Sequence, residues 1–297
     1  MSEQPRVFSA VQNVKTVLEL WTKLALNVRM RDRSVKVLQY GCQMLIGYWG
    51  TQLKENSLLQ LSTLRRASSN SRKAFWLLKS INHVGSIAGM IEDGTGTRLS
   101  SPFVDKLDFI EQLFLVLYYW YESEIYFARA GMFGLDEDVI DPWCNWTWLG
   151  GDVAFFFSGL LRLREHVKQQ RLLKDKLIVA SEQHQLLNHH HHQHQEQQQQ
   201  QQQKEANGGQ VVTTAPSRLE ELQLELKAMD RTKFDLQLSL AIGVLELGVS
   251  LHYCDVYKFI LREHISETYV GAMGVASSVL ILYEGLIKAR RELGEDI

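Results

Sequence analysis

Residues 64–86 carry basic and hydrophobic positions that repeat with the period of an α-helix. A helix turns about 100° per residue, so residues seven apart return to nearly the same side. The basic positions that gather on one face in this way are Arg65, Arg66, Arg72, Lys73 and Lys79. The hydrophobic positions on the other face include Phe75, Leu77, Leu78 and Ile81. The pattern therefore predicts one amphipathic helix over residues 64–86.

Two interpretations of this helix follow from its two faces. In a membrane interface, cations meet lipid phosphates while hydrophobic side chains enter the acyl boundary. In a soluble bundle, the same helix lies on the outside with its charged face in water. Trp76 lies at the edge of the basic side and favours the membrane, because an indole suits a boundary that is wet on one edge and apolar on the other.

The rest of the chain predicts helices as well. Its four prolines are widely spaced, and no segment alternates apolar and polar residues as a strand does. Residues 37–53 carry no charge, but their glutamines and glycines indicate a packed helix rather than a membrane span. We expect an all-α fold: a bundle of amphipathic and membrane-embedded helices with a disordered Gln/His-rich loop.

The middle region, residues 101–175, is rich in aromatic side chains. Three tryptophans at 143, 146 and 148 precede an apolar run, as in the aromatic belt of a membrane interface. A basic cluster at 162, 164 and 168 follows this run. The region is membrane-associated in our interpretation, and two arrangements stay open: a shallow hairpin in the bilayer, or the core of a helical bundle.

The C-terminal region, residues 218–297, contains the best candidate for a membrane span, at about 266–287. Small residues at Gly271, Gly274 and Ser278 form a face on which another helix can pack closely. The basic residues after the span, at 288, 290 and 291, place its C-terminal end in the cytosol by the positive-inside rule.

Residues 176–217 form a low-complexity linker between these regions. Its Gln/His tract, from Gln183 to Gln210, has little apolar surface to bury, and we expect a disordered loop. With residues 1–100 as an N-terminal amphipathic region, the chain divides into four parts.

Composition excludes several classes of function. A net charge of -2 argues against nucleic-acid binding, which calls for a basic excess. The three cysteines show no paired spacing, so we expect no zinc or other metal site and no cofactor. No serine lies in a Gly-x-Ser-x-Gly turn, and no histidine has a triad-like context, so we predict no catalytic residues and no enzyme.

Four stretches of the chain, in their order, resemble the peroxin-11 family of peroxisomal membrane proteins. They read RDRSVKVLQYGCQML, SRKAFWLLKSINHV, LYYWYESEIYFARAGMF and YVGAMGVASSVLILYEGL. The resemblance implies an integral protein of the peroxisomal membrane with both termini in the cytosol. It also implies that an amphipathic helix inserts into one leaflet and elongates the organelle before dynamin-dependent fission.

The resemblance also assigns roles to individual residues. Arg72, Lys73 and Lys79 correspond to lipid-facing cations, and the hydrophobic positions listed above to the inserting face. Where the family has a basic-glycine pair, this chain has a Trp-Leu-Leu run at 76–78, which makes the helix more apolar. The partners implied are anionic phospholipids, a second copy of the chain, a fission adaptor and a dynamin-related GTPase.

Two other functions remain open. The first is a metabolite channel, in which Glu122, Glu124, Asp152 and Glu246 line a polar path, because ionisable groups at membrane depth face one another or water. The second is a helical scaffold that recruits fission factors.

Overall fold

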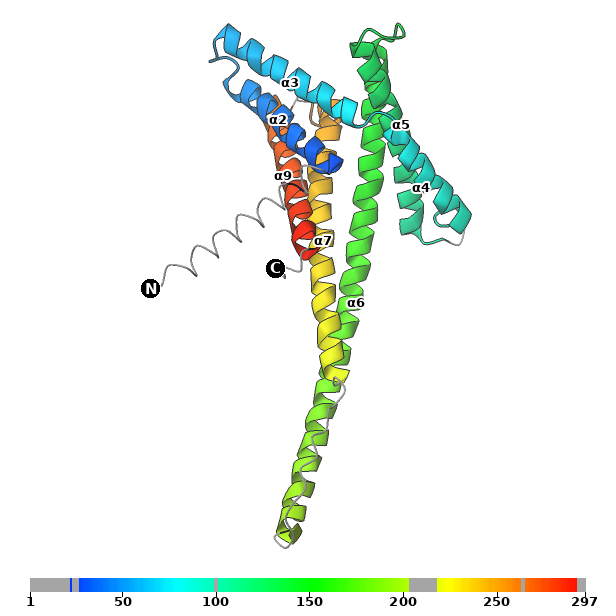
Figure 1. Ribbon diagram of the computed structural model, residues 1–297, viewed down its shortest axis with the longest axis vertical. Helices are drawn as coiled ribbons and strands as arrows, with labels where there is room; N and C mark the ends of the chain where they lie inside the picture. The colour runs from blue at the N-terminus through cyan, green and yellow to red at the C-terminus, as the bar shows by residue number, and fades with distance from the viewer. Residues whose placement is uncertain (1–21, 23–26, 99–100, 203–217, 263–264, 293–297) are drawn as a thin grey trace. The chain divides into compact units, whose positions relative to one another are not determined.

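The computed structural model describes residues 22, 27–98, 101–202, 218–262 and 265–292, and Figure 1 shows its helices. In chain order they are α2 (Val28–Trp49), α3 (Glu55–Phe75), α4 (Lys79–Asp93), α5 (Phe103–Arg129), α6 (Glu137–Gln202), α7 (Arg218–Tyr253), α8 (Val256–Leu261) and α9 (Glu267–Glu292). The described residues contain no strand. The prediction of an all-α fold is confirmed.

The chain folds into two compact units. The first comprises residues 1–160 and 238–297, and the second residues 161–237. Distant parts of the sequence thus share one unit, because the end of α7 and all of α9 pack with the N-terminal helices.

The core of the first unit lies where α2 packs against α9. Tyr40, Val249 and Val270 form one buried cluster there, and a second cluster contains Met30 and Ile281. Side chains from α2, α7 and α9 meet in these clusters, so burial of hydrophobic surface holds the three helices together. Helix α2 is thus a packed helix, as its glutamines and glycines indicate.

The second unit pairs the later part of α6 with the start of α7. The His166 ring contacts the carbonyl oxygen of Met229 at 2.8 Å, and the Gln170 amide donates a hydrogen bond to Asp230. Leu173 is buried. Polar contacts between the two helices thus supplement a narrow hydrophobic seam.

Helix α6 continues into the Gln/His tract as far as Gln202. The sequence predicts a loop from Gln183, and the helix is longer than that. Glutamine and glutamate are good helix formers, and the tract contains no glycine or proline before Gly208. Residues 203–210 of the tract lie outside the described residues.

Two helices of the described chain are long and apolar enough to cross a membrane, by length and composition. They are Glu220–Tyr253 in α7 and Glu267–Glu292 in α9. The second coincides with the span expected at about 266–287, and the first is an additional candidate. Helix α8 lies between them in the chain.

Candidate functional site

The amphipathic segment at 64–86 is two helices rather than one. Helix α3 ends at Phe75, α4 begins at Lys79, and Leu78 between them has the left-handed conformation, with φ of 61°. This conformation costs a non-glycine residue about 1 kcal/mol. Local contacts oppose the cost: the Lys79 N–H donates to the Trp76 carbonyl at 3.0 Å, and the Lys79 ammonium lies 3.7 Å from the centre of the Trp76 ring.

Three of the five cations in this segment point into the protein. Arg72 Nε donates to Asp32 at 3.0 Å, and Lys73 Nζ to Glu122 at 2.7 Å. Lys79 Nζ, which has no carboxylate partner among the described residues, donates to the Tyr119 hydroxyl at 2.7 Å. Buried cations require partners of this kind, because burial removes the water that stabilises their charge.

The other two cations face solvent. Arg65 and Arg66 are exposed, and neither has an ion-pair partner in the part of the chain that the structure describes. The five cations therefore do not form one common face: two are free to meet an external charge, and three are used inside the molecule.

The hydrophobic positions of the segment face outward. Leu78 and Ile81 are 65% and 61% exposed, and Phe75 is 36% exposed. Leu77 and Trp76 are half-buried. We call Phe75, Leu78 and Ile81 the junction surface. Large hydrophobic side chains that are exposed together mark a surface for a membrane, a partner or a ligand.

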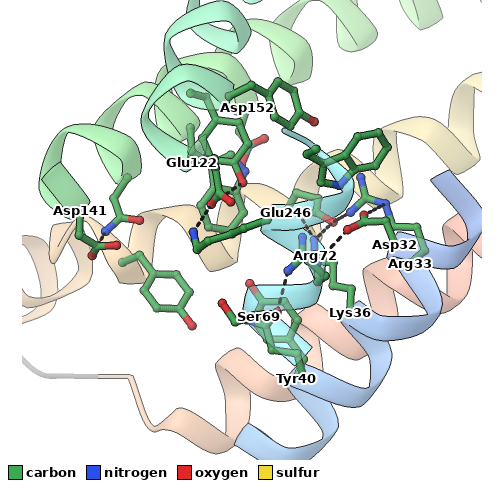
Figure 2. A pocket seen from close by; sticks show the side chains of 18 of the residues that line it. Asp32, Arg33, Lys36, Tyr40, Ser69, Arg72, Glu122, Asp141, Asp152 and Glu246 are labelled. Atoms are coloured by element: carbon green, nitrogen blue, oxygen red, sulfur yellow. Dashed lines mark hydrogen bonds and ion pairs between the residues drawn. The ribbon is translucent and has the colours of Figure 1, made fainter. Parts of the chain in front are cut away.

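Behind this junction lies a polar cavity of about 890 Å³, lined by side chains from α2, α3, α4, α5, α6, α7 and α9. Figure 2 shows acidic and basic side chains from α2, α3, α5, α6 and α7 converging on it. Glu122, Asp152 and Glu246, predicted to line a polar path, all line it. Glu124 does not, since its carboxylate instead accepts a hydrogen bond from the Trp120 indole at 2.8 Å.

Ion pairs cross the cavity wall between α2 and α7. Lys36 Nζ lies 2.5 Å from both carboxylate oxygens of Glu246, and Arg33 Nη1 lies 3.5 Å from one of them. Lys36 is 2% exposed. Burial lowers the pKa of Lys36, and the paired carboxylate opposes this shift. The pair fixes α2 against a part of α7, residues 236–251, that carries no other charge.

Two other groups in the cavity have unusual proton affinities. The pKa of Asp152 is raised to about 8, first by burial and then by the negative charge of Glu246. Its Oδ2 atom is buried and accepts no hydrogen bond from any described residue. The pKa of Lys79 is lowered to about 8, first by burial and then by the positive charge of Arg33. Asp152 is therefore largely protonated at neutral pH.

Where α9 meets α2, small residues replace ion pairs. Gly271, Gly274 and Ser278, expected to form a packing face, are buried in α9. A Cβ atom on Gly271 would lie 2.6 Å from the backbone nitrogen of Met44, and one on Gly47 would lie 2.6 Å from that of Thr268. Glycine is thus required on both helices for their backbones to approach this closely.

The internal partners of the cations are the residues that sequence reasoning missed. The sequence gives no sign that Asp32, Tyr119 and Gln39 have a role, because an isolated polar residue in a helix more often faces solvent than joins a hydrogen-bond network. Glu122 and Glu246 stood out as charges within hydrophobic stretches, yet nothing local linked them to Lys73 or Lys36. Among the described residues, no group of His, Cys, Asp and Glu has the arrangement of a metal site.

A comparison with protein families identifies the chain. The family model for peroxisomal biogenesis factor 11 (PEX11) matches residues 18–285, which is most of its length. The chain belongs to the PEX11 family. The resemblance drawn from the four stretches is confirmed.

PEX11 proteins are non-enzymatic peroxins, and membership implies a role in peroxisome biogenesis and proliferation. With the two candidate spans, it also indicates a peroxisomal membrane location and a context of peroxisome fission. Comparisons with curated proteins and with solved structures gave no match.

Proposed function

We propose that the protein elongates peroxisomes by inserting the junction surface into one leaflet of the membrane, ahead of dynamin-dependent fission, and so regulates peroxisome number and size. The observation that carries this proposal is the outward exposure of Phe75, Leu78 and Ile81. The three cations nearest to them in the sequence, Arg72, Lys73 and Lys79, are held inside. A hydrophobic surface that enters only one leaflet expands it relative to the other, and the membrane bends.

The energetics favour hydrophobic insertion over attraction by charge. Burying the three exposed side chains contributes roughly 1.5–3 kcal/mol each in gross terms. The exposed cations Arg65 and Arg66 add about 1 kcal/mol each on an anionic surface. The hydrophobic contribution is therefore the larger one, and we expect binding to depend more on lipid packing defects than on salt.

Replacing Leu78 and Ile81 with glutamate tests the insertion. The double variant Leu78→Glu/Ile81→Glu should abolish peroxisome elongation in cells, because insertion would bury two carboxylates in the acyl region. The matched control adds the same charges at exposed polar positions of α4, as Asn82→Glu/Ser86→Glu, and should retain most of the elongation. The measurement is peroxisome length by microscopy, with equal amounts of each variant in the membrane fraction.

Normal elongation by the Leu78→Glu/Ile81→Glu variant would refute the insertion mechanism. Loss of elongation in both double variants would instead show that added charge, rather than the loss of the junction surface, is responsible.

We also propose that the protein is integral to the membrane with both termini in the cytosol. Two crossings, by α7 and α9, return the chain to the side on which it began. The basic residues Lys288, Arg290 and Arg291 after the second crossing favour the cytosol. Protease added to intact organelles should therefore remove tags from both ends, while a protected C-terminal tag would contradict this topology.

The proposed partners are anionic phospholipids, another copy of the chain, a fission adaptor and a dynamin-related GTPase. The first is supported by the exposed Arg65 and Arg66 on α3, the helix that ends at Phe75. The others rest on the fission context of the family. A scaffold that recruits fission factors without entering the bilayer is the alternative, and extraction of the protein by alkaline carbonate would favour it.

A metabolite channel is the second candidate function, and the polar cavity supports it. Glu122, Asp152 and Glu246 line this cavity within a bundle that contains both candidate spans. Ionisable groups at membrane depth commonly mark a path for ions or solutes. Solute efflux from vesicles that contain the purified protein tests this function, and efflux that Glu122→Gln leaves unchanged would argue against it.

A further inference from the structure

One end of the polar cavity has more positive than negative charge. Helix α2, the α3–α4 junction and α5 meet there. Four cations line the cavity here, and two carboxylates pair with them: Asp32 with Arg33 and Arg72, and Glu246 with Arg33. The four cations are Arg29, Arg33, Arg72 and Lys79.

Both carboxylates are already paired, and Glu246 also binds Lys36. Arg72 Nε lies 3.0 Å from Asp32 Oδ1, and Arg33 Nε lies 3.6 Å from Asp32 Oδ2. Both oxygens thus face a guanidinium group. The remaining two cations have no carboxylate partner among the described residues: Lys79 contacts Tyr119, and Arg29 is exposed at the rim.

A histidine beside Lys79 has a polar atom without a partner. The His83 ring stacks on Tyr119, with centroids 5.2 Å apart, and its Nδ1 contacts Gln112 Oε1 at 2.8 Å. Its Nε2 is buried and has no hydrogen bond to any described residue. A buried polar atom of this kind calls for a ligand or water. Burial lowers the pKa of His83, and a bound anion would oppose this shift. Protonated His83 would then donate from Nε2 to the anion while Nδ1 donates to Gln112.

The beginning of α4 adds to this positive potential. Lys79 is the first residue of the helix, its first turn contains no acidic residue, and no side chain caps it. The dipole of the helix favours an anion at this end. Arg72 and Tyr119 hold the surrounding side chains in place, so the donors are oriented before a ligand arrives.

We propose that this end of the cavity binds a phosphate monoester, held by Lys79, His83, Arg33 and Arg29. A dianion would offset part of the excess of positive charge left after Asp32 and Glu246 are paired. Its oxygens accept charge-assisted hydrogen bonds from ammonium, guanidinium and imidazolium groups. The phosphate belongs either to the head group of phosphatidic acid or to a soluble phosphate ester. This site is independent of membrane insertion by the junction surface.

Calorimetry of the full-length protein in a neutral detergent tests the site with three probes. Glycerol 3-phosphate represents a soluble ester, and dioctanoyl phosphatidic acid represents the lipid head group. Dioctanoyl phosphatidylserine, a phosphodiester, is the comparison. We expect phosphatidic acid, glycerol 3-phosphate or both to bind, and phosphatidylserine to bind more weakly. Binding of the lipid alone would identify the head group as the source, and equal binding of both would identify the phosphate itself.

Four variants connect the binding to the named residues. Lys79→Gln should weaken binding about tenfold or more, which is the loss of one charge-assisted hydrogen bond. Lys79→Arg should retain most of the affinity, and Lys54→Gln, at an exposed lysine outside the cavity, should change nothing. Arg29→Gln removes an exposed side chain that makes no hydrogen bond or ion pair with any described residue, so it should weaken binding without affecting the fold.

Absence of binding by the wild-type protein to both phosphate monoesters would overturn the proposal. Equal affinity of the wild type, Lys79→Gln and Arg29→Gln would overturn it as well. Thermal unfolding of each variant shows whether a lost signal reflects the site or the fold. The calorimetry does not depend on peroxisome length. A lack of phosphate binding would therefore not contradict the proposed elongation, and a lack of elongation would not contradict the phosphate site.

Discussion

Helix α2 contacts α9 through one interface and α3 through another, and the two interfaces use opposite chemistry. Against α9, Gly47 and Gly271 let the two backbones approach closely. Against α3, buried charge replaces small size: Arg72 bonds both Asp32 and Gln39 of α2. The first interface is specified by shape, and the second by the pairing of charges that are too costly to bury alone.

This difference explains which side of α3 and α4 faces outward. At the α2–α9 interface, which is specified by shape, hydrophobic side chains pack inside and α9 buries its small residues. On α3, where ion pairs decide the orientation, the cations Arg72 and Lys73 point inward. The hydrophobic positions are therefore left on the surface. The junction surface is therefore a consequence of the ion pairs behind it, and breaking those pairs should affect both the fold and the proposed insertion.

The largest effect is expected from the variant Arg72→Met, which breaks the interface specified by charge. It leaves the carboxylate of Asp32, which is 1% exposed, without its closest partner. Removing one member of a buried pair costs about 3–5 kcal/mol of stability. Denaturant unfolding of the purified protein measures this loss.

The control for Arg72→Met is Lys288→Met, which breaks an exposed pair with Glu284 on α9. An exposed pair contributes about 0.3–0.5 kcal/mol at helix spacing, so this variant should unfold almost as the wild type does. Equal losses in the two variants would mean that the α2–α3 ion pair has no special role.

A smaller loss is expected at the interface specified by shape. In Gly271→Ala, the added methyl group would meet the backbone of Met44, which cannot rotate away as a side chain can. Such overpacking costs about 1–3 kcal/mol. The matched control is Ala272→Leu, a larger change at an exposed position of the same helix, which should have little effect on unfolding. Equal stability of Gly271→Ala and the wild type would show that α2 and α9 do not require glycine there.

The smallest effect concerns the protonated Asp152 in the cavity that the charged interface borders. Its pKa is raised from an ordinary carboxyl value to about 8, so the folded protein holds a proton that the unfolded chain releases above pH 4. Stability therefore falls as pH rises from about 4 to about 8. Asp152→Asn removes this dependence while keeping the shape of the side chain.

We expect Asp152→Asn to raise stability at pH 7, because an amide has no proton to lose where the buried carboxyl begins to ionise, and to leave stability unchanged near pH 4. The melting temperatures of both proteins over this range provide the measurement. A difference that is the same at both pH values would show that Asp152 titrates normally.

Some features followed directly from the sequence. Helical periodicity and the scarcity of proline predicted the all-α fold, and the order of four short stretches predicted the family. The small residues at 271, 274 and 278 predicted a close helix contact. Each of these rests on neighbours in the chain or on spacing along one helix, so no knowledge of distant contacts was needed.

Other features required the tertiary structure. Three features depend on residues far away in the chain. They are the break between α3 and α4 at Leu78, the inward direction of Arg72, Lys73 and Lys79, and the packing of α2 against α9. Arg72 and Asp32 are 40 positions apart, and Lys36 and Glu246 are 210 positions apart.

The sequence alone determined that residues 64–86 are helical and have a basic side and a hydrophobic side. Only the tertiary structure decided which of these sides faces the protein. The periodicity of an amphipathic helix is the same in either orientation. The cost of burying a charge, however, depends on whether the interior contains an oppositely charged partner. Asp32 and Glu122 provide those partners, and they leave the hydrophobic side for the surroundings.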